Sequence, residues 1–276
     1  MFITKADGNR EEFKVQKLIV SLKKAGVGRS EIDTIVRTVE QSLFDGISTH
    51  DIYKKAFELL RESAEPHAAK YSLRRAVIGL GPTGFPFEDF LGRIYEAQGY
   101  KTKRRLILKG KCATHEIDLA AYSPTHSFVA EAKFHARPGI KSDLQVAMYS
   151  YARYLDLQSQ RICKDDTCGV ISLAVITNTK FTTAAIKYAA CTGITLIDWD
   201  YPKKGSLQSM IEDFHVYPIT VLTRLGNTQK QMLLQQNVIL CEEIVKNPQV
   251  LTPLGLSQGK RDAIVAEARL LGTYTI

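Results

Sequence analysis

Asp118, Glu131 and Lys133 lie on two apolar segments that are joined by a short polar turn. The first segment covers residues 115–122 and the second covers residues 127–134. Both are rich in residues typical of β-strands, and the Ser-Pro-Thr-His stretch between them is typical of a turn. Because side chains alternate across a strand, Glu131 and Lys133 project from one face, and a hairpin would bring Asp118 to that face from the neighbouring strand.

Two carboxylates and an ammonium group at one place are suited to chemistry on a phosphodiester. Mg²⁺ takes oxygen ligands and keeps several waters, so Asp118 and Glu131 with a phosphate oxygen form a suitable coordination set. The metal lowers the pKa of a bound water and neutralises charge developing on the phosphate, while Lys133 beside that water could orient or deprotonate it. The alternative is that all three are solvated charges with an ordinary cross-strand pair.

The flanking residues predict the elements that would hold this hairpin in place. Residues 85–91 predict the start of a helix that carries Glu88. Gln145 and Tyr149 are four residues apart, so they are neighbours on one helical face. Further along, the sequence predicts a buried strand, a polar passage into another helix, and a last core strand. These three segments cover residues 169–177, 178–185 and 193–198.

In this order, the features of residues 85–200 resemble the PD-(D/E)xK restriction-endonuclease superfamily, particularly its Mrr-like branch. The resemblance implies that Asp118 and Glu131 bind the metal, with Glu88 on the preceding helix as a further acidic ligand. It also implies that Lys133 is the catalytic lysine. For Glu88, the alternative is first-turn charge at a helix start, which the helix dipole favours.

The helix after the hairpin also agrees with the Mrr-like pattern. Gln145 and Tyr149 match Gln-x-x-x-Tyr, which implies that Gln145 supports the catalytic lysine or contacts DNA phosphate. The alternative is that both residues are the edge of a buried stripe. The chain departs from the pattern where Glu116-Ile117 precedes Asp118, because the superfamily often has a proline there. The resemblance as a whole implies an endonuclease that cuts DNA with Mg²⁺ or Mn²⁺, in restriction or defence.

The amino-terminal residues have a different pattern. Residues 2–13 predict a short β-hairpin with Asp7-Gly8 at its turn. Four amphipathic helical stretches follow, at about residues 14–26, 30–45, 48–62 and 66–78. This arrangement resembles the ATP-cone, the nucleotide-sensing domain of ribonucleotide reductases and of their transcriptional repressor. The resemblance implies that ATP or dATP binds as a regulatory ligand, with contacts from Lys5, Glu11, Lys17 and Thr49.

One departure from the ATP-cone pattern concerns a phosphate-binding cation. Ala6 stands where an Arg is usual, although Arg10 and Lys14 could compensate. The alternative to nucleotide binding is a small helical domain whose lysines form a solvated basic face. The sequence has no Gly-x-x-x-x-Gly-Lys loop, so a nucleoside triphosphate is expected to be a ligand rather than a hydrolysed fuel.

The charge of the chain favours a polyanionic partner such as DNA. The formal net charge of the 276 residues is +8, and 45% hydrophobic residues are enough to build the cores of two domains. Six basic residues precede the hairpin and could grip phosphates beside the cut site. They are Lys101, Lys103, Arg104, Arg105, Lys109 and Lys111. The alternative is a strand edge that these charges protect from aggregation.

The cysteines and the apolar runs bear on the cellular setting. Five cysteines form an odd set without zinc-ligand spacing, which predicts reduced thiols in a cytoplasmic protein. No apolar leader is present, and no apolar run has the length of a membrane span, so no membrane association is expected.

These observations predict an α/β chain, α+β overall, in three parts. A helical ATP-cone with a small β-hairpin is expected at residues 1–80, and a restriction-endonuclease-like mixed β-sheet core flanked by helices at residues 84–220. A C-terminal helical extension is expected at residues 221–276. Three glycines and a proline in residues 79–84 predict a linker between the first two parts. Within the extension, residues 226–247 predict one helical stretch.

The expected function is a nucleotide-regulated, divalent-metal-dependent endodeoxyribonuclease. The cone would gate activity or oligomerisation, so a homo-oligomer is among the expected states. Two other functions stay open at this point. One is a catalytically inactive, DNA-binding regulator that senses nucleotides, and the other is a nuclease that acts on RNA or on DNA repair intermediates.

Overall fold

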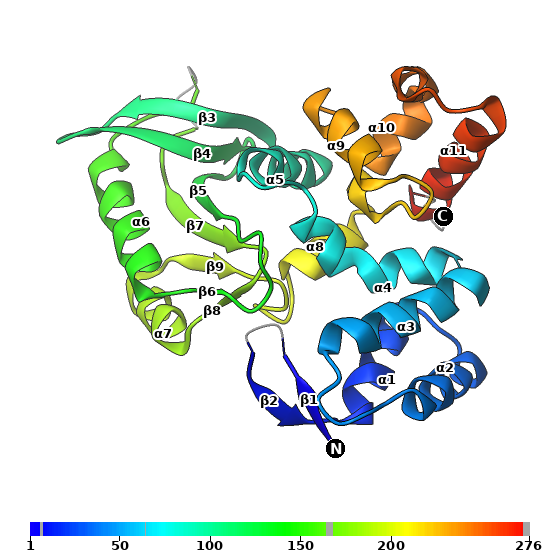
Figure 1. The fold of residues 1–276 in the computed structure, drawn as a ribbon. Helices are drawn as coiled ribbons and strands as arrows, with labels where there is room; N and C mark the ends of the chain where they lie inside the picture. Colours follow the sequence, from blue (N-terminus) through cyan, green and yellow to red (C-terminus); the bar gives the residue numbers. More distant parts are fainter. Residues whose placement is uncertain (6–7, 64, 164–167, 273–276) are drawn as a thin grey trace.

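A five-stranded mixed sheet forms the centre of the middle part of the chain (Figure 1). The computed structural model describes residues 1–5, 8–63, 65–163 and 168–272. In chain order, the strands are β3 (Lys101–Lys109), β4 (Thr114–Tyr122), β5 (Ser127–Lys133), β7 (Ser172–Thr177) and β9 (Thr195–Ile197). The strands β3, β4 and β5 pair antiparallel, while β5, β7 and β9 pair parallel, in the order β3-β4-β5-β7-β9.

Helices cover both faces of this sheet, because alternate side chains along its strands make each face apolar. Helix α5 (Phe85–Ala97) packs on the face of Leu119 and Ala130. Helices α6 (Leu144–Leu157) and α7 (Thr183–Thr192) pack on the face of Ala120 and Val129. They provide the crossovers that parallel strands require. A separate two-stranded sheet pairs β6 (Lys141–Ser142) with β8 (Lys180–Phe181).

The amino-terminal part is helical, as the sequence predicts. An antiparallel pair, β1 (Phe2–Thr4) and β2 (Arg10–Glu12), precedes four helices. These are α1 (Val15–Lys24), α2 (Arg29–Gln41), α3 (Thr49–Ser63) and α4 (Glu65–Ile78). Their inward residues, Leu22, Val39 and Leu60 among them, form one apolar cluster. Asp7, which was predicted at the hairpin turn, and Ala6, which stands where the ATP-cone pattern has an Arg, lie outside the described residues.

The chain after β9 is also helical, but the single helical stretch that was predicted over residues 226–247 is divided. It contains α8 (Leu207–Asp213), a 3-10 helix η1 (Ile219–Val221), α9 (Asn227–Gln235), α10 (Cys241–Lys246), a 3-10 helix η2 (Pro248–Leu254) and α11 (Gln258–Gly272). The prediction of one helical stretch over residues 226–247 is wrong. Asn237 adopts a left-handed φ of 58°, which asparagine tolerates, and the Glu243 carboxylate accepts the N–H groups of Ile239 and Leu240 just before α10.

One apolar core crosses the segment that was predicted to be a linker. Leu73, Val77 and Leu80 pack in the same cluster as buried residues of α5, of the sheet and of the C-terminal helices. Helix α4 therefore lies between the other amino-terminal helices and the C-terminal helices (Figure 1). The hydroxyl of Thr220 donates to the Ala76 carbonyl at 2.7 Å. Residues 79–84 thus connect parts that are already in direct contact.

The cysteines differ from expectation in one pair. Cys163 and Cys168 form a disulfide, so the prediction of reduced thiols is wrong for them. The backbone brings them together, since the Ile162 N–H donates to the Cys168 carbonyl at 2.8 Å. Cys112, Cys191 and Cys241 remain thiols. Within the described ranges, no helix has the length and apolar character needed to cross a membrane.

Candidate active site at the β4–β5 hairpin

Asp118 lies where the ladder of β4 is interrupted on both sides. On one side, the pairing with β3 omits Arg105, whose left-handed φ of 52° is uncommon for a residue with a side chain. On the other side, the pairing with β5 ends at Leu119 and Ala130. At this break, the Asp118 carboxylate accepts the N–H of Ala132 at 2.7 Å. The acidic side chain therefore substitutes for a ladder partner and fixes the middle residue of the Glu-x-Lys triplet.

Glu131 and Lys133 occupy the end of β5, where each interacts electrostatically with Asp118. The Lys133 ammonium lowers the pKa of both the Asp118 and the Glu131 carboxyl groups, and the Asp118 charge raises that of Glu131. Burial is the largest influence on each carboxyl group, and it raises the pKa of both above the ordinary value. The structure thus brings the three residues of the predicted motif into mutual electrostatic range.

Glu88 approaches Asp118 from the first turn of α5. Only 8% of the residue is exposed, and burial raises the pKa of its carboxyl group to about 7, with a further contribution from the negative charge of Asp118. Arg105 reaches it at 3.2 Å from the break in β3. The left-handed backbone at Arg105 thus accompanies an ion pair that spans from the sheet to α5.

The chemistry of these groups fits a divalent cation, although they do not enclose one by themselves. The three carboxyl groups supply hard oxygen atoms, and Glu88 and Glu131 both feel the charge of Asp118. No group of three or more His, Cys, Asp or Glu side chains within the described residues could hold a metal ion. A Mg²⁺ ion needs only one or two carboxylates when waters and phosphate oxygens complete the shell. The assignment of Glu88 as a ligand stays a prediction.

Arg153 is a member of the site that the sequence did not reveal. Its guanidinium donates to the Glu131 carboxylate and to the Glu116 carbonyl oxygen. It also lies 5.5 Å from the ring centroid of Tyr149, one helical turn earlier on α6. The spacing of Gln145, Tyr149 and Arg153, four residues each, places all three on one face of α6. Continuing the Gln-x-x-x-Tyr spacing by one step would have found Arg153.

Gln145 and Tyr149 themselves are exposed. Asp143 caps α6 by accepting the Val146 N–H at 3.2 Å, so the helix begins directly before Gln145. Tyr149 is 63% exposed, which argues against the alternative that it is part of a buried stripe. Both side chains are accessible to a large ligand that approaches the hairpin.

Two buried polar residues fix the backbone at Lys133, and sequence reasoning assigned neither to the site. The Thr177 hydroxyl donates to the Lys133 carbonyl at 2.7 Å. The Asn178 amide accepts the His135 N–H and donates to the His135 carbonyl, both at 2.9 Å. Because β5 and β7 are parallel, their carboxyl ends meet at one edge of the sheet, where these bonds form.

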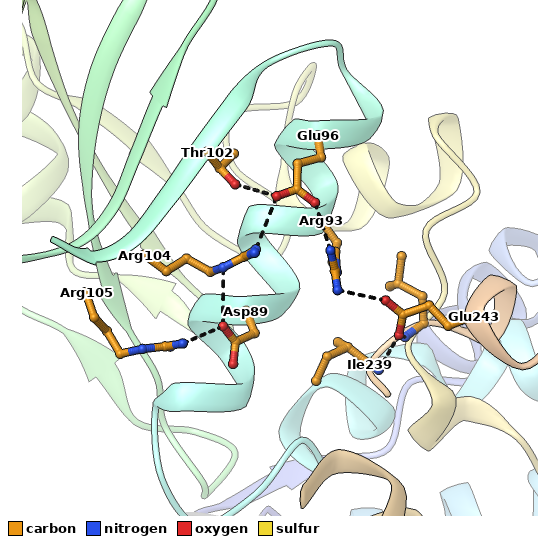
Figure 2. Close-up of polar contacts among 9 residues, drawn as sticks. Asp89, Arg93, Glu96, Thr102, Arg104, Arg105, Ile239 and Glu243 are labelled. Carbon is orange, nitrogen blue, oxygen red and sulfur yellow. Dashed lines mark hydrogen bonds and ion pairs between the residues drawn. The ribbon is translucent and has the colours of Figure 1, made fainter. Parts of the chain in front are cut away.

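Helix α5 is held in position by ion pairs on two sides (Figure 2). Towards β3, Asp89 forms an ion pair with Arg104 at 3.4 Å and accepts a hydrogen bond from Arg105 at 2.9 Å. Towards the C-terminal helices, Arg93 forms an ion pair with Glu243 at 3.1 Å. Figure 2 shows these contacts along the length of α5, from β3 on one side to α10 on the other. They position the helix that carries Glu88.

The predicted phosphate-gripping cluster is therefore divided. Arg104 and Arg105 are engaged by acidic residues of α5, and the Lys103 ammonium donates to the Ile162 carbonyl at 2.8 Å. Lys101 and Lys109 are exposed on β3, which is an edge strand of the sheet. For Lys101 and Lys109, this arrangement agrees with the alternative hypothesis of a strand edge that is protected by its charges.

The predicted nucleotide-binding residues separate into two places. Glu11 pairs with Lys17 at 2.8 Å and with Lys5 at 3.5 Å, and its bond to Lys17 is the largest cause of its lowered pKa. Lys5 and Thr49 line a cavity of about 940 Å³. Lys17 lines a different cavity of about 260 Å³. Lys5 and Lys17 thus share Glu11 but face different spaces.

Comparison with known proteins identifies two families within the chain. Residues 1–77 match the ATP cone domain, which confirms the predicted ATP-cone, and residues 217–271 match the family described as AF1548-like, C-terminal. An uncharacterized protein of Archaeoglobus fulgidus is 34% identical over 180 residues, which cover 65% of this chain and 98% of the relative. The crystal structure of AF1548, a protein of unknown function, is similar with a TM-score of 0.56 and 32% identity, over 69% of this chain and 99% of AF1548.

Proposed function

The chain belongs to the AF1548-like family and carries an ATP cone, and from this basis we propose that it is a nucleotide-regulated, divalent-metal-dependent endodeoxyribonuclease. One observation carries the proposal. Asp118 and Glu131 extend from adjacent strands into a partly buried site. The charge of Asp118 raises the pKa of Glu131, and the Lys133 ammonium lowers the pKa of both carboxyl groups. A helix before the hairpin, a helix after it and a mixed sheet are the frame expected of a restriction-endonuclease-like core.

In this proposal, each residue of the hairpin has one task. Asp118 and Glu131 would hold the cation, and Glu88 adds a third carboxyl group next to Asp118. When bound, Mg²⁺ or Mn²⁺ supplies a Lewis acid that lowers the pKa of a water and neutralises charge on the phosphate. Lys133 orients the attacking water through its ammonium group. The bonds from Thr177 and Asn178 support this role, because they fix the strand end from which Lys133 projects.

Arg153 links the site to the DNA backbone. In the present arrangement its guanidinium neutralises Glu131. A guanidinium can bind a carboxylate or a phosphate with the same fork of donors. We therefore assign Arg153 to the scissile phosphate, which its guanidinium would contact if Glu131 held a cation. Gln145 lies two turns earlier on the same face of α6, where it would contact the phosphate backbone of the DNA or support Lys133.

The proposed partner is DNA, and the proposed biological role is restriction or defence. The net charge of +8 and the exposed lysines of β3 support a polyanionic partner. Contacts of this kind would give affinity that falls as the salt concentration rises. ATP or dATP at the cone is the proposed regulator of cleavage.

A second candidate function is a DNA-binding regulator that senses nucleotides without cutting DNA. One observation favours it: Arg153 already neutralises Glu131. In that case, the hairpin would be a grip for DNA. A nuclease for RNA or for repair intermediates would use the same residues, and its substrate would distinguish it.

The test is cleavage of plasmid DNA, single-stranded DNA and RNA by the full chain with Mg²⁺ or Mn²⁺, with and without ATP and dATP. The decisive variant is Lys133→Ala, and Lys187→Ala on the exposed face of α7 is its matched control. Metal-dependent cleavage that Lys133→Ala abolishes and Lys187→Ala retains would support the nuclease. Binding of DNA by all three proteins, with no cleavage in any condition, would favour the regulator.

A further inference from the structure

The cavity that contains Lys5 and Thr49 has walls from two parts of the chain. Its volume is about 940 Å³. One wall comes from β1, the start of α3 and the end of α4, and the other comes from the segment before β6 and from β8. Figure 1 shows the β1–β2 pair next to β6 and β8, although these elements are far apart in the sequence. The space is large enough for a nucleotide.

We propose that the regulatory nucleotide binds in this cavity with its phosphates held from both sides. Lys5 and Arg75 belong to the ATP cone, whereas Lys141 and Lys180 belong to the two-stranded sheet beside the proposed nuclease core. The inference rests on the proposed function, because it specifies where the nucleotide that regulates the chain makes contact. The regulatory site is thus completed by residues outside the cone.

The charge of the cavity walls favours a polyanion. Five of the lining residues are Lys or Arg, and none is Asp or Glu. These five are Lys5, Arg74, Arg75, Lys141 and Lys180. Two of them pair with carboxylates, Lys5 with Glu11 at 3.5 Å and Lys180 with Asp200 at 2.9 Å, while Arg75 contacts the His50 ring at 2.8 Å. Exposed ion pairs of this kind stabilise little, so a triphosphate can exchange with the carboxylates.

The pairing of β6 with β8 is a second observation that indicates an anion. Lys141 and Lys180 are register partners in this parallel pair. Like charges at neighbouring positions repel. Asp200 already offsets the charge of Lys180, and an anion between the two lysines would offset both charges. Ser142 and Phe181, the next partners in the register, are 1% and 5% exposed, so the short sheet is anchored by its other residues. The two lysines are therefore presented on a fixed support.

The apolar part of the cavity suits a base. Ile78 and Ile140 line it from opposite parts of the chain, and Ile140 is 44% exposed. Apolar side chains that lie open beside a cationic wall match the two ends of a nucleotide, which has an apolar ring face and a charged phosphate chain. A ligand of this shape would cover Ile140.

The same segment leads directly to the candidate active site. Residues 134–140 connect Lys133 to Lys141, and Pro138, Gly139 and Ile140 line the cavity. His135 contacts the Ser142 hydroxyl at 3.0 Å, next to Lys141. A nucleotide that holds Lys141 would therefore act on the position of Lys133 through this segment, and on α6, which begins directly after Ser142.

Two other cavities fit a nucleotide less well. The cavity that Lys17 lines is also basic, but its volume of about 260 Å³ lies below the usual range of ligand pockets. A cavity of about 520 Å³ lies between α4 and the C-terminal helices. Its two basic residues are Arg75 and Lys230, and the Lys230 ammonium already donates to the Thr220 carbonyl at 2.8 Å.

The experiment measures binding of ATP, dATP and AMP to the full chain by isothermal titration calorimetry. The variants are Lys141→Ala, Lys180→Ala and their combination, with Lys5→Ala as the cone variant and Lys187→Ala as the control. Loss of a charged hydrogen bond weakens binding by roughly tenfold to a hundredfold. We expect that loss for ATP in each cavity variant, a smaller loss for AMP, and unchanged binding in the control. Circular dichroism and thermal melting would verify folding of each variant.

The outcomes separate the inference from the function on which it rests. If Lys5→Ala weakens ATP binding while the Lys141→Ala and Lys180→Ala proteins bind ATP as the parent does, the nucleotide binds the cone alone and the inference is overturned. If the parent chain binds none of the three nucleotides, nucleotide regulation and the inference both fail. Because the measurement does not depend on cleavage, an inactive nuclease with the expected binding pattern would leave the inference supported.

Discussion

Arg153 and Glu131 form an ion pair across the space between α6 and β5, and this pair joins the candidate active site to the helix that follows it. Both side chains are largely buried, with 13% and 19% exposure. The pair also neutralises one of two carboxylates whose charges otherwise repel. We therefore expect this ion pair to affect the stability of the fold, the binding of a cation and the position of α6.

Replacing Arg153 with alanine is expected to destabilise the fold and to increase its response to divalent cations. Without the guanidinium, Glu131 keeps an unpaired charge near Asp118, which lowers the free energy of unfolding by about 1–3 kcal/mol. Mg²⁺ or Mn²⁺ should then raise the melting temperature of the Arg153→Ala protein more than that of the parent. The comparison is thermal melting with each cation and with a chelator. An Arg153→Lys variant keeps the charge and should lie between the two, whereas an equal response in all three proteins would contradict the prediction.

Glu88 is expected to make stability depend on pH between about 4.5 and 7. Its pKa in the fold is about 7, above the ordinary 4.5, so the folded state favours the protonated carboxyl group. The stabilisation that comes from this proton is present below pH 4.5 and is lost as the pH rises through 7. In Glu88→Gln this dependence disappears. The free energy of unfolding of the variant, relative to the parent, should rise by up to about 3 kcal/mol from pH 4.5 to pH 8. Urea unfolding in chelator at several pH values tests it, and a constant difference would refute it.

Asp156 is expected to stabilise the β3–β4 turn at neutral pH but not in acid. Its carboxylate accepts from His115 at 2.7 Å and from the N–H groups of Cys112 and Ala113, and the bond to His115 is the largest cause of its lowered pKa. A lowered pKa means that the stabilisation is present above pH 3.8, the ordinary value, and is lost as the pH falls below it. Asp156→Asn should therefore melt at a lower temperature than the parent at pH 7, with a difference that narrows in strong acid. A difference that is the same at pH 7 and at pH 2 would argue against this role.

Asn178 is expected to be a positioning residue for Lys133. In Asn178→Ala, the N–H and carbonyl groups of His135 lose their partners in a partly buried place, which should lower the free energy of unfolding by roughly 2–3 kcal/mol. If the nuclease proposal holds, kcat should also fall, with little change in the affinity for DNA. Asn178→Asp retains the acceptor for the N–H and should be less affected. A variant that loses stability but keeps the parent kcat would assign Asn178 a structural role alone.

The local parts of the structure were predictable from the sequence, and the long-range parts were not. The β4–β5 hairpin follows from alternation and a polar turn, and the four amino-terminal helices follow from apolar periodicity. The left-handed backbone at Arg105 has no local signal, because its partners Glu88 and Asp89 lie on another element. Arg153 was missed for a similar reason: one residue on a helix becomes important only when packing places it against Glu131.

The boundary between the parts of the chain was also set by packing rather than by composition. Glycine and proline in residues 79–84 do end helix α4, as the sequence indicates. They do not separate two bodies, because Leu80 lies within the segment and is fully buried. The break within residues 226–247 also depends on packing. Asn237 is only a weak sequence signal for a helix end, and the burial of Val238, Ile239 and Leu240 fixes the chain after it.

The core that α4 shares with its neighbours determines how the molecule should respond to heat and to proteases. A domain on a flexible tether melts by itself and is released by a single cut in the tether. Here, removal of the first 80 residues would strip Leu73 and Val77 from α5 and from the C-terminal helices. We therefore expect one cooperative calorimetric transition for the whole chain, and no protease-resistant fragment that ends near residue 80. Nucleotide binding at the amino-terminal part would then act through small shifts in this shared core, without a hinge motion of one domain relative to another.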